Sequence, residues 1–224
     1  GRRMKTFKEY FEQQPDSRAA GEEISKFHMK QAEEEAKRYM DRVEQEENAN
    51  ETVALLAGGF KPPHKGHLKL FNKLLKDADK GVIFIGKKQD REGREWITPD
   101  ASKAIWEIYT RGGKPVEVNI APISPVTSSY DFADDNTDKK IIIGSGPGDA
   151  ARNSGFKNKD RYPHVALIPQ EKALGGGIRA KDMKKYLEVG NIEEAVKRFA
   201  PLEDLNETDI DAITNILQKD WNNR

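Results

Sequence analysis

The chain has 224 residues with 38 acidic and 38 basic side chains, so it carries no net charge, and its mean hydropathy is -0.83. A balanced charge disfavours nucleic-acid or anionic-membrane partners, and the absence of cysteine excludes disulfides, thiolate catalysis and cysteine metal sites. No apolar run approaches the roughly 20 residues of a membrane span and no signal-peptide pattern is present, so we expect a soluble cytoplasmic protein.

Residues 1–50 are predicted to form a charged helical extension, with its main helix from about Glu22 to Glu46. Apolar residues recur there at alternating spacings of three and four, and the remaining positions are mostly Glu, Lys and Gln. This stripe consists of Met29, Ala32, Ala36, Tyr39 or Met40, and Val43. Such a stripe is typical of a packing face. The helix is expected to pack either on the main domain or on a second copy, and the second alternative makes a homo-oligomer.

Residues 51–190 have the pattern of an α/β domain, and residues 191–224 that of a C-terminal helical segment. Buried strands are predicted at Val53–Ala57, Val82–Ile85, Val116–Ile120, Ile141–Ile143 and Val165–Ile168. Helices are predicted from near Lys65, after a Thr98 cap, and near Ala180–Val189, Ile192–Phe199 and Glu207–Trp221. The stretch Ser124–Asp131 is interpreted as a polar loop. Strands that alternate with helices predict a doubly wound, Rossmann-like parallel sheet of about five strands.

The most informative segment follows the first predicted strand and reads Gly58-Gly59-Phe60-Lys61-Pro62-Pro63-His64-Lys65-Gly66-His67. Ligands bind at the carboxyl ends of strands in open parallel sheets, and the two glycines let the backbone approach a nucleotide closely. His64 and His67 are three residues apart at the start of a helix and can point the same way. The free N–H groups and positive dipole end of that helix favour an anion.

This segment resembles the HxGH signature of the nucleotidylyltransferase superfamily, which includes nicotinamide-mononucleotide and pantetheine-phosphate adenylyltransferases and the cytidylyltransferases. The spacing from Phe60 through Pro62 to His64 is closer to the adenylyltransferase branches. The family's second signature, Ile-Ser-Ser-Thr-x-Ile-Arg, has a counterpart in residues 173–179, where Ile178 and Arg179 match. Leu174, Gly175 and Gly176 replace the hydroxyl residues, and backbone N–H groups of the glycine run could take their place. The resemblance covers roughly residues 52–190.

The resemblance implies transfer of a nucleoside monophosphate to a small phosphorylated acceptor with release of pyrophosphate. AMP from ATP is favoured, and CMP from CTP is the alternative. His64 and His67 would donate to triphosphate oxygens, Arg179 would hold the β- and γ-phosphates, and Mg²⁺ would be carried by the triphosphate rather than by side chains. The implied nucleotide-binding residues are Gly58, Gly59, Phe60, Lys61, Lys65, Gly66, Gly144, Gly146, Asp149, Gly177 and Ile178.

Weaker candidates for acceptor binding are Lys88, Arg91 and Arg94, which follow the second strand together with Lys87. A solvated basic loop is an equal alternative for them, and a tight turn is the alternative for residues 144–149. For the whole chain, the alternative function is a non-catalytic nucleotide-binding or structural module that keeps the fold. The missing hydroxyls favour that alternative, whereas the intact HxGH motif and Arg179 favour an enzyme. A charged helical oligomerisation protein is a third and weaker reading.

Overall fold

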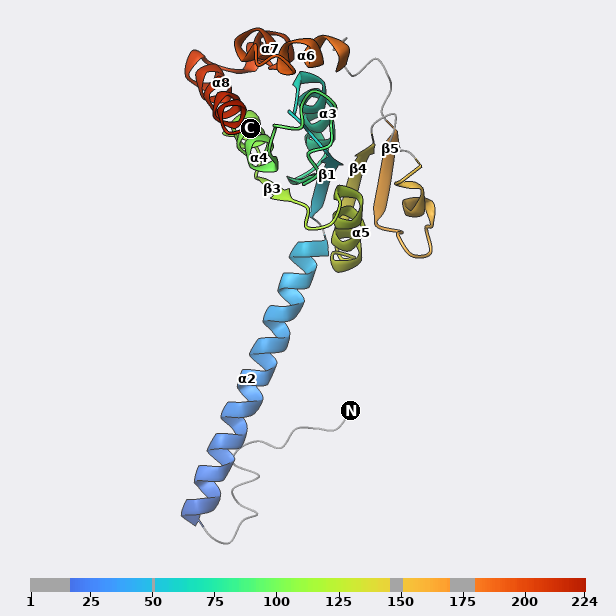
Figure 1. The fold of residues 1–224 in the computed structure, drawn as a ribbon. Coiled ribbons are helices and arrows are strands. Elements are labelled where there is room, and N and C mark those ends of the chain that lie inside the picture. Colours follow the sequence, from blue (N-terminus) through green and yellow to red (C-terminus); the bar gives the residue numbers. More distant parts are fainter. Residues whose placement is uncertain (1–16, 50, 146–150, 170–179) are drawn as a thin grey trace. The chain divides into compact units, whose positions relative to one another are not determined.

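The structure is a computed structural model that describes residues 17–49, 51–145, 151–169 and 180–224 (Figure 1). It divides into two compact units, residues 1–49 and residues 50–224. In the first unit, helix α2 (Ser17–Ala49) is continuous over 33 residues and extends beyond both ends of the predicted helix. Among the residues described, none of the helices is long and apolar enough to cross a membrane.

The second unit is built on a five-stranded parallel sheet with the order β3-β2-β1-β4-β5. Its strands are β1 (Thr52–Gly58), β2 (Lys80–Ile85), β3 (Val116–Ile120), β4 (Lys140–Ser145) and β5 (Val165–Pro169). Every predicted strand is confirmed, and β1 lies in the middle, where Leu55 is in register with Val82 on one side and Ile143 on the other. The predicted doubly wound α/β fold is therefore the observed one.

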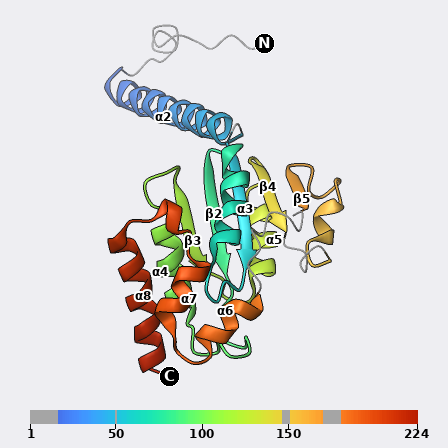
Figure 2. The same cartoon turned by 90° about the horizontal axis from the view of Figure 1, so that it is seen from above.

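Helices cover both faces of this sheet (Figures 1 and 2). On one face, α3 (Lys65–Lys76) and α4 (Pro99–Thr110) pack on Ala54 and Leu56, which point out of the same side of β1. On the other face, α5 (Pro125–Asp135) and the short helix η1 (Ser154–Lys157) enclose Leu55. The two faces of β1 are both buried, which explains why its sequence is a continuous apolar run rather than an alternating one.

Helix α5 corrects the interpretation of Ser124–Asp131 as a polar loop. Ser124 is the N-cap of this helix, its Oγ accepts a hydrogen bond from the N–H of Thr127 at 3.0 Å, and Pro125 occupies the first helical position. Both are strong helix-start signals, because a serine oxygen satisfies a free N–H and proline has the right φ and no N–H to lose. The polar residues that suggested a loop are those of the first turn.

The C-terminal helices join the core of the same unit. They are α6 (Ala180–Leu187), α7 (Ile192–Phe199) and α8 (Glu207–Asn222), with the short helix η3 (Leu202–Asp204) between the last two. Ile192, Phe199 and Leu217 are buried in the cluster that contains α3 and α4. Residues 191–224 thus complete the covering layer on one face of the sheet rather than standing apart from it.

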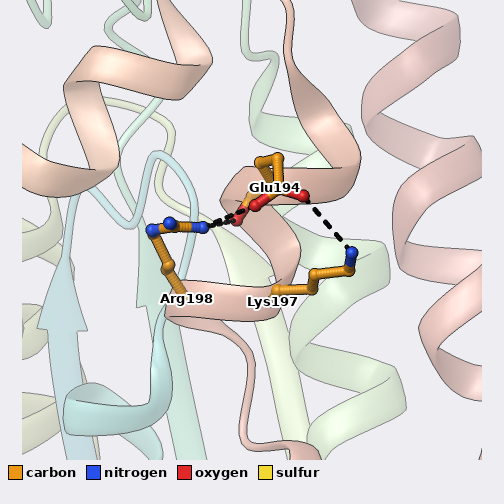
Figure 3. A network of polar contacts seen from close by, with 3 residues as sticks. All are labelled: Glu194, Lys197 and Arg198. Atoms are coloured by element: carbon orange, nitrogen blue, oxygen red, sulfur yellow. Dashed lines mark hydrogen bonds and ion pairs between the residues drawn. The ribbon is translucent and has the colours of Figure 1, made fainter.

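On its outer side, α7 carries a small ionic network (Figure 3). Glu194 accepts hydrogen bonds from Arg198 Nη1 at 2.8 Å and from Lys197 Nζ at 3.3 Å, and these two bonds lower the pKa of its carboxyl group. The Arg198 guanidinium also lies over the ring of Tyr186 on α6, 4.2 Å from its centre. The network therefore links α6 to α7 across the turn that separates them.

Candidate active site

The sheet places the end of β1 at the position where open α/β folds bind ligands. The strand order reverses between β1 and β4, and such a switch opens a crevice beyond the carboxyl ends of the strands. Gly58 ends β1 next to Ile85 at the end of β2, and α3 begins at Lys65 after six intervening residues, 59–64. The predicted phosphate loop therefore lies at the switch point.

His64 and His67 make a reciprocal capping box at the start of α3. The Nδ1 atom of His64, the N-cap residue, accepts hydrogen bonds from the N–H groups of Gly66 at 3.0 Å and His67 at 3.3 Å. The His64 N–H in turn donates to His67 Nδ1 at 3.0 Å. The two imidazole rings are stacked, with centres 3.5 Å apart and planes inclined by 19°. This corrects one expectation: two of the first-turn N–H groups bind His64, so they do not face an anion.

These bonds determine the protonation of both rings. A backbone N–H can only donate, so each Nδ1 must be an unprotonated acceptor, and a neutral ring then carries its proton on Nε2. Burial lowers the pKa of His64 to about 4, with further contributions from the positive charges of Arg94 and Lys65. Burial also holds the pKa of His67 well below its usual value. The charges of His64, Arg91 and Arg94 lower it further, each by less than burial does. Both histidines are therefore neutral Nε2–H donors at pH 7.

Phe60 packs against the histidine pair through the ring of His67. Its ring meets the ring of His67 edge-on at 4.9 Å and that of Trp106 at 5.2 Å, and its backbone has a φ of 49°. A methyl group on Gly58 would lie 2.9 Å from the Phe60 ring, so the glycine is needed for this ring to fold back on the strand end. The glycine and the phenylalanine of the motif thus position His67 by packing.

Helix α4 holds the loop from behind through two hydroxyl groups. Ser102 Oγ donates to the Phe60 carbonyl at 2.5 Å, and Tyr109 OH donates to the Pro63 carbonyl at 3.0 Å. Both side chains are buried. The sequence did not identify either residue as part of the site, because both lie on a helix with no motif of its own and only the tertiary contact shows that they support the loop.

Lys61 bridges the ends of two strands. Its ammonium donates to the carbonyls of Gly59 at 2.6 Å and Gly86 at 2.5 Å, which join the loops after β1 and β2. The side chain is buried, and this burial, with Arg91 nearby, lowers its pKa to about 8 against the opposing effect of Asp90. Two of the three N–H groups of this ammonium are therefore used to hold the two loops together.

Two arginines of the loop after β2, Arg91 and Arg94, lie near the loop that carries the histidines. Arg91 lies across the strand end, since a methyl group on Gly59 would be 3.3 Å from its Nη2. Arg94 Nη1 donates to the Lys61 carbonyl at 3.3 Å, while its Nε is buried with no hydrogen-bond partner among the residues described. Both arginines lower the pKa of His67. The structure thus brings Arg91 and Arg94 within electrostatic reach of His67, although Arg91 is exposed, as is Lys88.

The other predicted site residues are placed as follows. Gly66 is buried within the histidine cap, and Lys65 is exposed at the first turn of α3. Gly144 packs against α3, because a methyl group there would lie 2.5 Å from Leu74 Cδ1. Gly146, Asp149, Gly177, Ile178 and Arg179 lie outside the described residues.

Helix α6, which begins directly after Arg179, is attached to the basic loop. Lys184 of α6 forms an ion pair with Glu92 at 3.2 Å. A methyl group on Gly93 would lie 3.0 Å from Glu188 Cβ and 3.2 Å from Lys184 Cε, so the loop backbone lies directly against the helix. The second half of α6 and the residue that follows it therefore pack against the loop that carries Arg91 and Arg94.

The side chains that meet here are suited to anions rather than to a metal ion. They are neutral N–H donors and cations, and each imidazole has its Nδ1 occupied and its proton on Nε2. Within the described ranges there is no group of three or more His, Asp or Glu side chains that could hold a metal ion. A Mg²⁺ ion would fit this site as the counterion of a polyphosphate, bound through phosphate oxygens.

Comparisons with known proteins gave fold-level likenesses only. No family model and no curated protein matches the chain. Among solved structures, it is similar to a putative nicotinate-nucleotide adenylyltransferase from Vibrio parahaemolyticus, with 13% identity, a TM-score of 0.48, and coverage of 73% of this chain and 98% of that one. It is also similar to Enterococcus italicus Csm6 bound to cyclic hexa-2'-fluoro-hexa-dAMP, with 10% identity, a TM-score of 0.39, and coverage of 76% and 49%. At these values, neither likeness bears on function.

Proposed function

We propose that the chain is a nucleotidylyltransferase that transfers a nucleoside monophosphate to a small phosphorylated acceptor and releases pyrophosphate. The observation that carries this proposal is the stacked pair of His64 and His67. Both rings are locked with Nδ1 inward, so two neutral Nε2–H donors are presented side by side at the switch point. Two adjacent donors of this kind match neighbouring oxygens of a polyphosphate.

The chemistry requires no protein nucleophile. An oxygen of the acceptor phosphate attacks the α-phosphorus, the bond from that phosphorus to the bridging oxygen breaks, and pyrophosphate leaves with the bonding electrons. Negative charge therefore develops on the leaving group. His64 and His67 would donate to that group, and their hydrogen bonds would strengthen as the charge grows. Because both rings are neutral donors, they act without transferring a proton.

The cationic side chains around the histidine pair would neutralise and orient the phosphate groups of the nucleotide. Arg91 and Arg94 lie close to the histidines and are proposed to hold anionic oxygens, for which their planar guanidinium groups are suited. Lys61 would direct its third N–H toward the same anion. Arg179 is proposed to bind the β- and γ-phosphates, and Mg²⁺ to neutralise the triphosphate it arrives with.

For the nucleotide, we propose AMP from ATP, with CMP from CTP as the alternative, on the Phe60-x-Pro62-x-His64 spacing. The competing function is a nucleotide-binding or structural module without turnover. The replacement of the second signature's hydroxyl residues by Leu174, Gly175 and Gly176 favours that module. The preserved cap and donor pair favour the enzyme, since a purely structural helix start is as well served by serine or aspartate.

The test combines binding with turnover. Isothermal titration of the full chain against the four nucleoside triphosphates with Mg²⁺ should show one preferred ligand, and a pyrophosphate-release screen over phosphorylated acceptors should then show turnover. His67→Ala should lower kcat/KM by about 10²- to 10³-fold. The matched control is His28→Ala on α2, which should leave turnover unchanged. Binding without pyrophosphate release would support the module, and unchanged activity in His67→Ala would refute the assigned role.

A further inference from the structure

Helix α2 carries an apolar stripe that is exposed along its middle. Met29 and Tyr39 are 64% and 58% exposed, the alanines at 32 and 36 are exposed as well, and Val43 is half-buried. These five residues repeat every seven positions, as 29, 36 and 43 and as 32 and 39. That is the spacing at which one helix packs along another in a two-stranded coil.

The small residues of the stripe leave a hollow on the helix surface. It is lined by Ala32, Glu35, Ala36, Arg38, Tyr39 and Arg42. Ala32 and Ala36, one turn apart, are its small residues, and Tyr39 and Arg42 are larger residues of its lining. The Arg42 guanidinium lies 5.9 Å from the centre of the Tyr39 ring. A hollow of this kind can receive a large side chain from a facing helix.

The order of small and large residues selects an antiparallel partner with the same sequence. When Ala36 faces the partner subunit's Tyr39, Ala32 faces the partner subunit's Val43, so each small residue meets a large one. In the same register, Glu35 on one flank faces the partner subunit's Arg42, and the two-fold symmetry repeats this contact. A parallel pair would instead place alanine against alanine and Glu35 opposite Met40.

We propose that α2 is a self-association element that forms an antiparallel two-helix dimer with α2 of a second copy of this chain. Its contact consists of Ala32, Ala36, Tyr39 and Val43 of the stripe, and Glu35 pairs with Arg42 twice along the same flank. The stripe spans 15 residues, or about 22 Å of helix, so the association is weak and reversible. This proposal is independent of the one for the α/β unit.

Sedimentation equilibrium of the full chain tests it directly, with circular dichroism to verify that each variant keeps its helix. The chain should form a dimer in the micromolar range. Tyr39→Glu places a charge in the stripe and should weaken the dimer about tenfold or more. The matched control is Phe27→Glu, which removes an aromatic ring of similar exposure (63%) from a different face of α2 and should leave the dimer intact.

A charge exchange tests the antiparallel register. Arg42→Glu should weaken the dimer at low salt, because residues 35 and 42 of facing helices would then both be negative. Adding Glu35→Arg should restore the dimer, because position 35 of each copy would again face an opposite charge at position 42 of the other. Spin labels on Met29→Cys, in a chain with no other cysteine, should lie about 25 Å apart in the antiparallel dimer and much closer in a parallel one. A chain that remains monomeric, equal effects of Tyr39→Glu and Phe27→Glu, or no rescue by the exchange would overturn the proposal.

Discussion

The histidine cap predicts a specific pH dependence of stability, and His64→Asn isolates it. Asparagine is a good N-cap whose side-chain oxygen can accept from the same first-turn N–H groups, but it has no titratable ring. At pH 7 the variant should therefore fold with little loss of stability. Any difference between the two proteins that grows on acidification then reports the titration of His64.

The sign and size follow from the pKa of the ring in the two states. In the unfolded chain His64 takes up a proton below its usual pKa of 6.5, whereas the folded chain resists protonation until about pH 4. The unfolded state thus binds more protons between these values, so stability is fully present above pH 6.5 and falls as the pH drops toward 4. One proton corresponds to about 1.4 kcal/mol per pH unit, which gives a loss of about 2 kcal/mol between pH 7 and pH 5.

Urea unfolding followed by circular dichroism at pH 7, 6 and 5 measures this loss. The wild-type chain should lose about 2 kcal/mol more than His64→Asn over that interval. The matched control is Ser124→Asn, which exchanges the N-cap of α5 without removing a titratable group and should follow the wild type. If His64→Asn lost stability as steeply as the wild type, the imidazole would titrate freely in the folded state, and the inward Nδ1 acceptor would be wrong.

Three further changes test the surroundings of the site. Gly144→Ala should cost about 1–3 kcal/mol of unfolding free energy in urea titrations, because the new methyl group lies 2.5 Å from Leu74 Cδ1, and it should cost less in a Leu74→Ala background. Tyr109→Phe should cost about 1–3 kcal/mol in the same assay by leaving the Pro63 carbonyl unpaired, and an unchanged midpoint would contradict that contact. In the proposed reaction, kcat/KM should fall above about pH 8 as Lys61 loses its charge, and this fall should be absent in Lys61→Met.

The sheet was predictable because the pattern that identifies a buried strand is local. A run such as Val53–Ala57 is apolar on both faces, as expected of a short strand covered by two layers of helices. Helix α5 was not predicted, since its first turn is a run of polar residues and its apolar side, which includes Ala133, is short. Its start signal, serine followed by proline, was nevertheless present at 124–125.

In the site, the sequence identified the residues of the loop but not their contacts. The predicted helix from near Lys65 implied that His64 and His67 would lie at the start of a helix, which they do. It did not predict that each ring would accept from the backbone, because a histidine can orient either nitrogen inward. Nor did it predict the direction of Lys61, whose two carbonyl partners are 2 and 25 residues away.

The cap that begins α3 and the proposed chemistry depend on the same hydrogen bonds. A serine at position 64 would start the helix equally well, but it has no second nitrogen that could donate a hydrogen bond. With histidine, the bonds that satisfy the N–H groups of Gly66 and His67 also fix the proton on Nε2. Stability and donor geometry are therefore coupled in this motif. They separate in variants such as His64→Asn, which keep the acceptor of the cap and remove the imidazole Nε2–H proposed to meet a triphosphate.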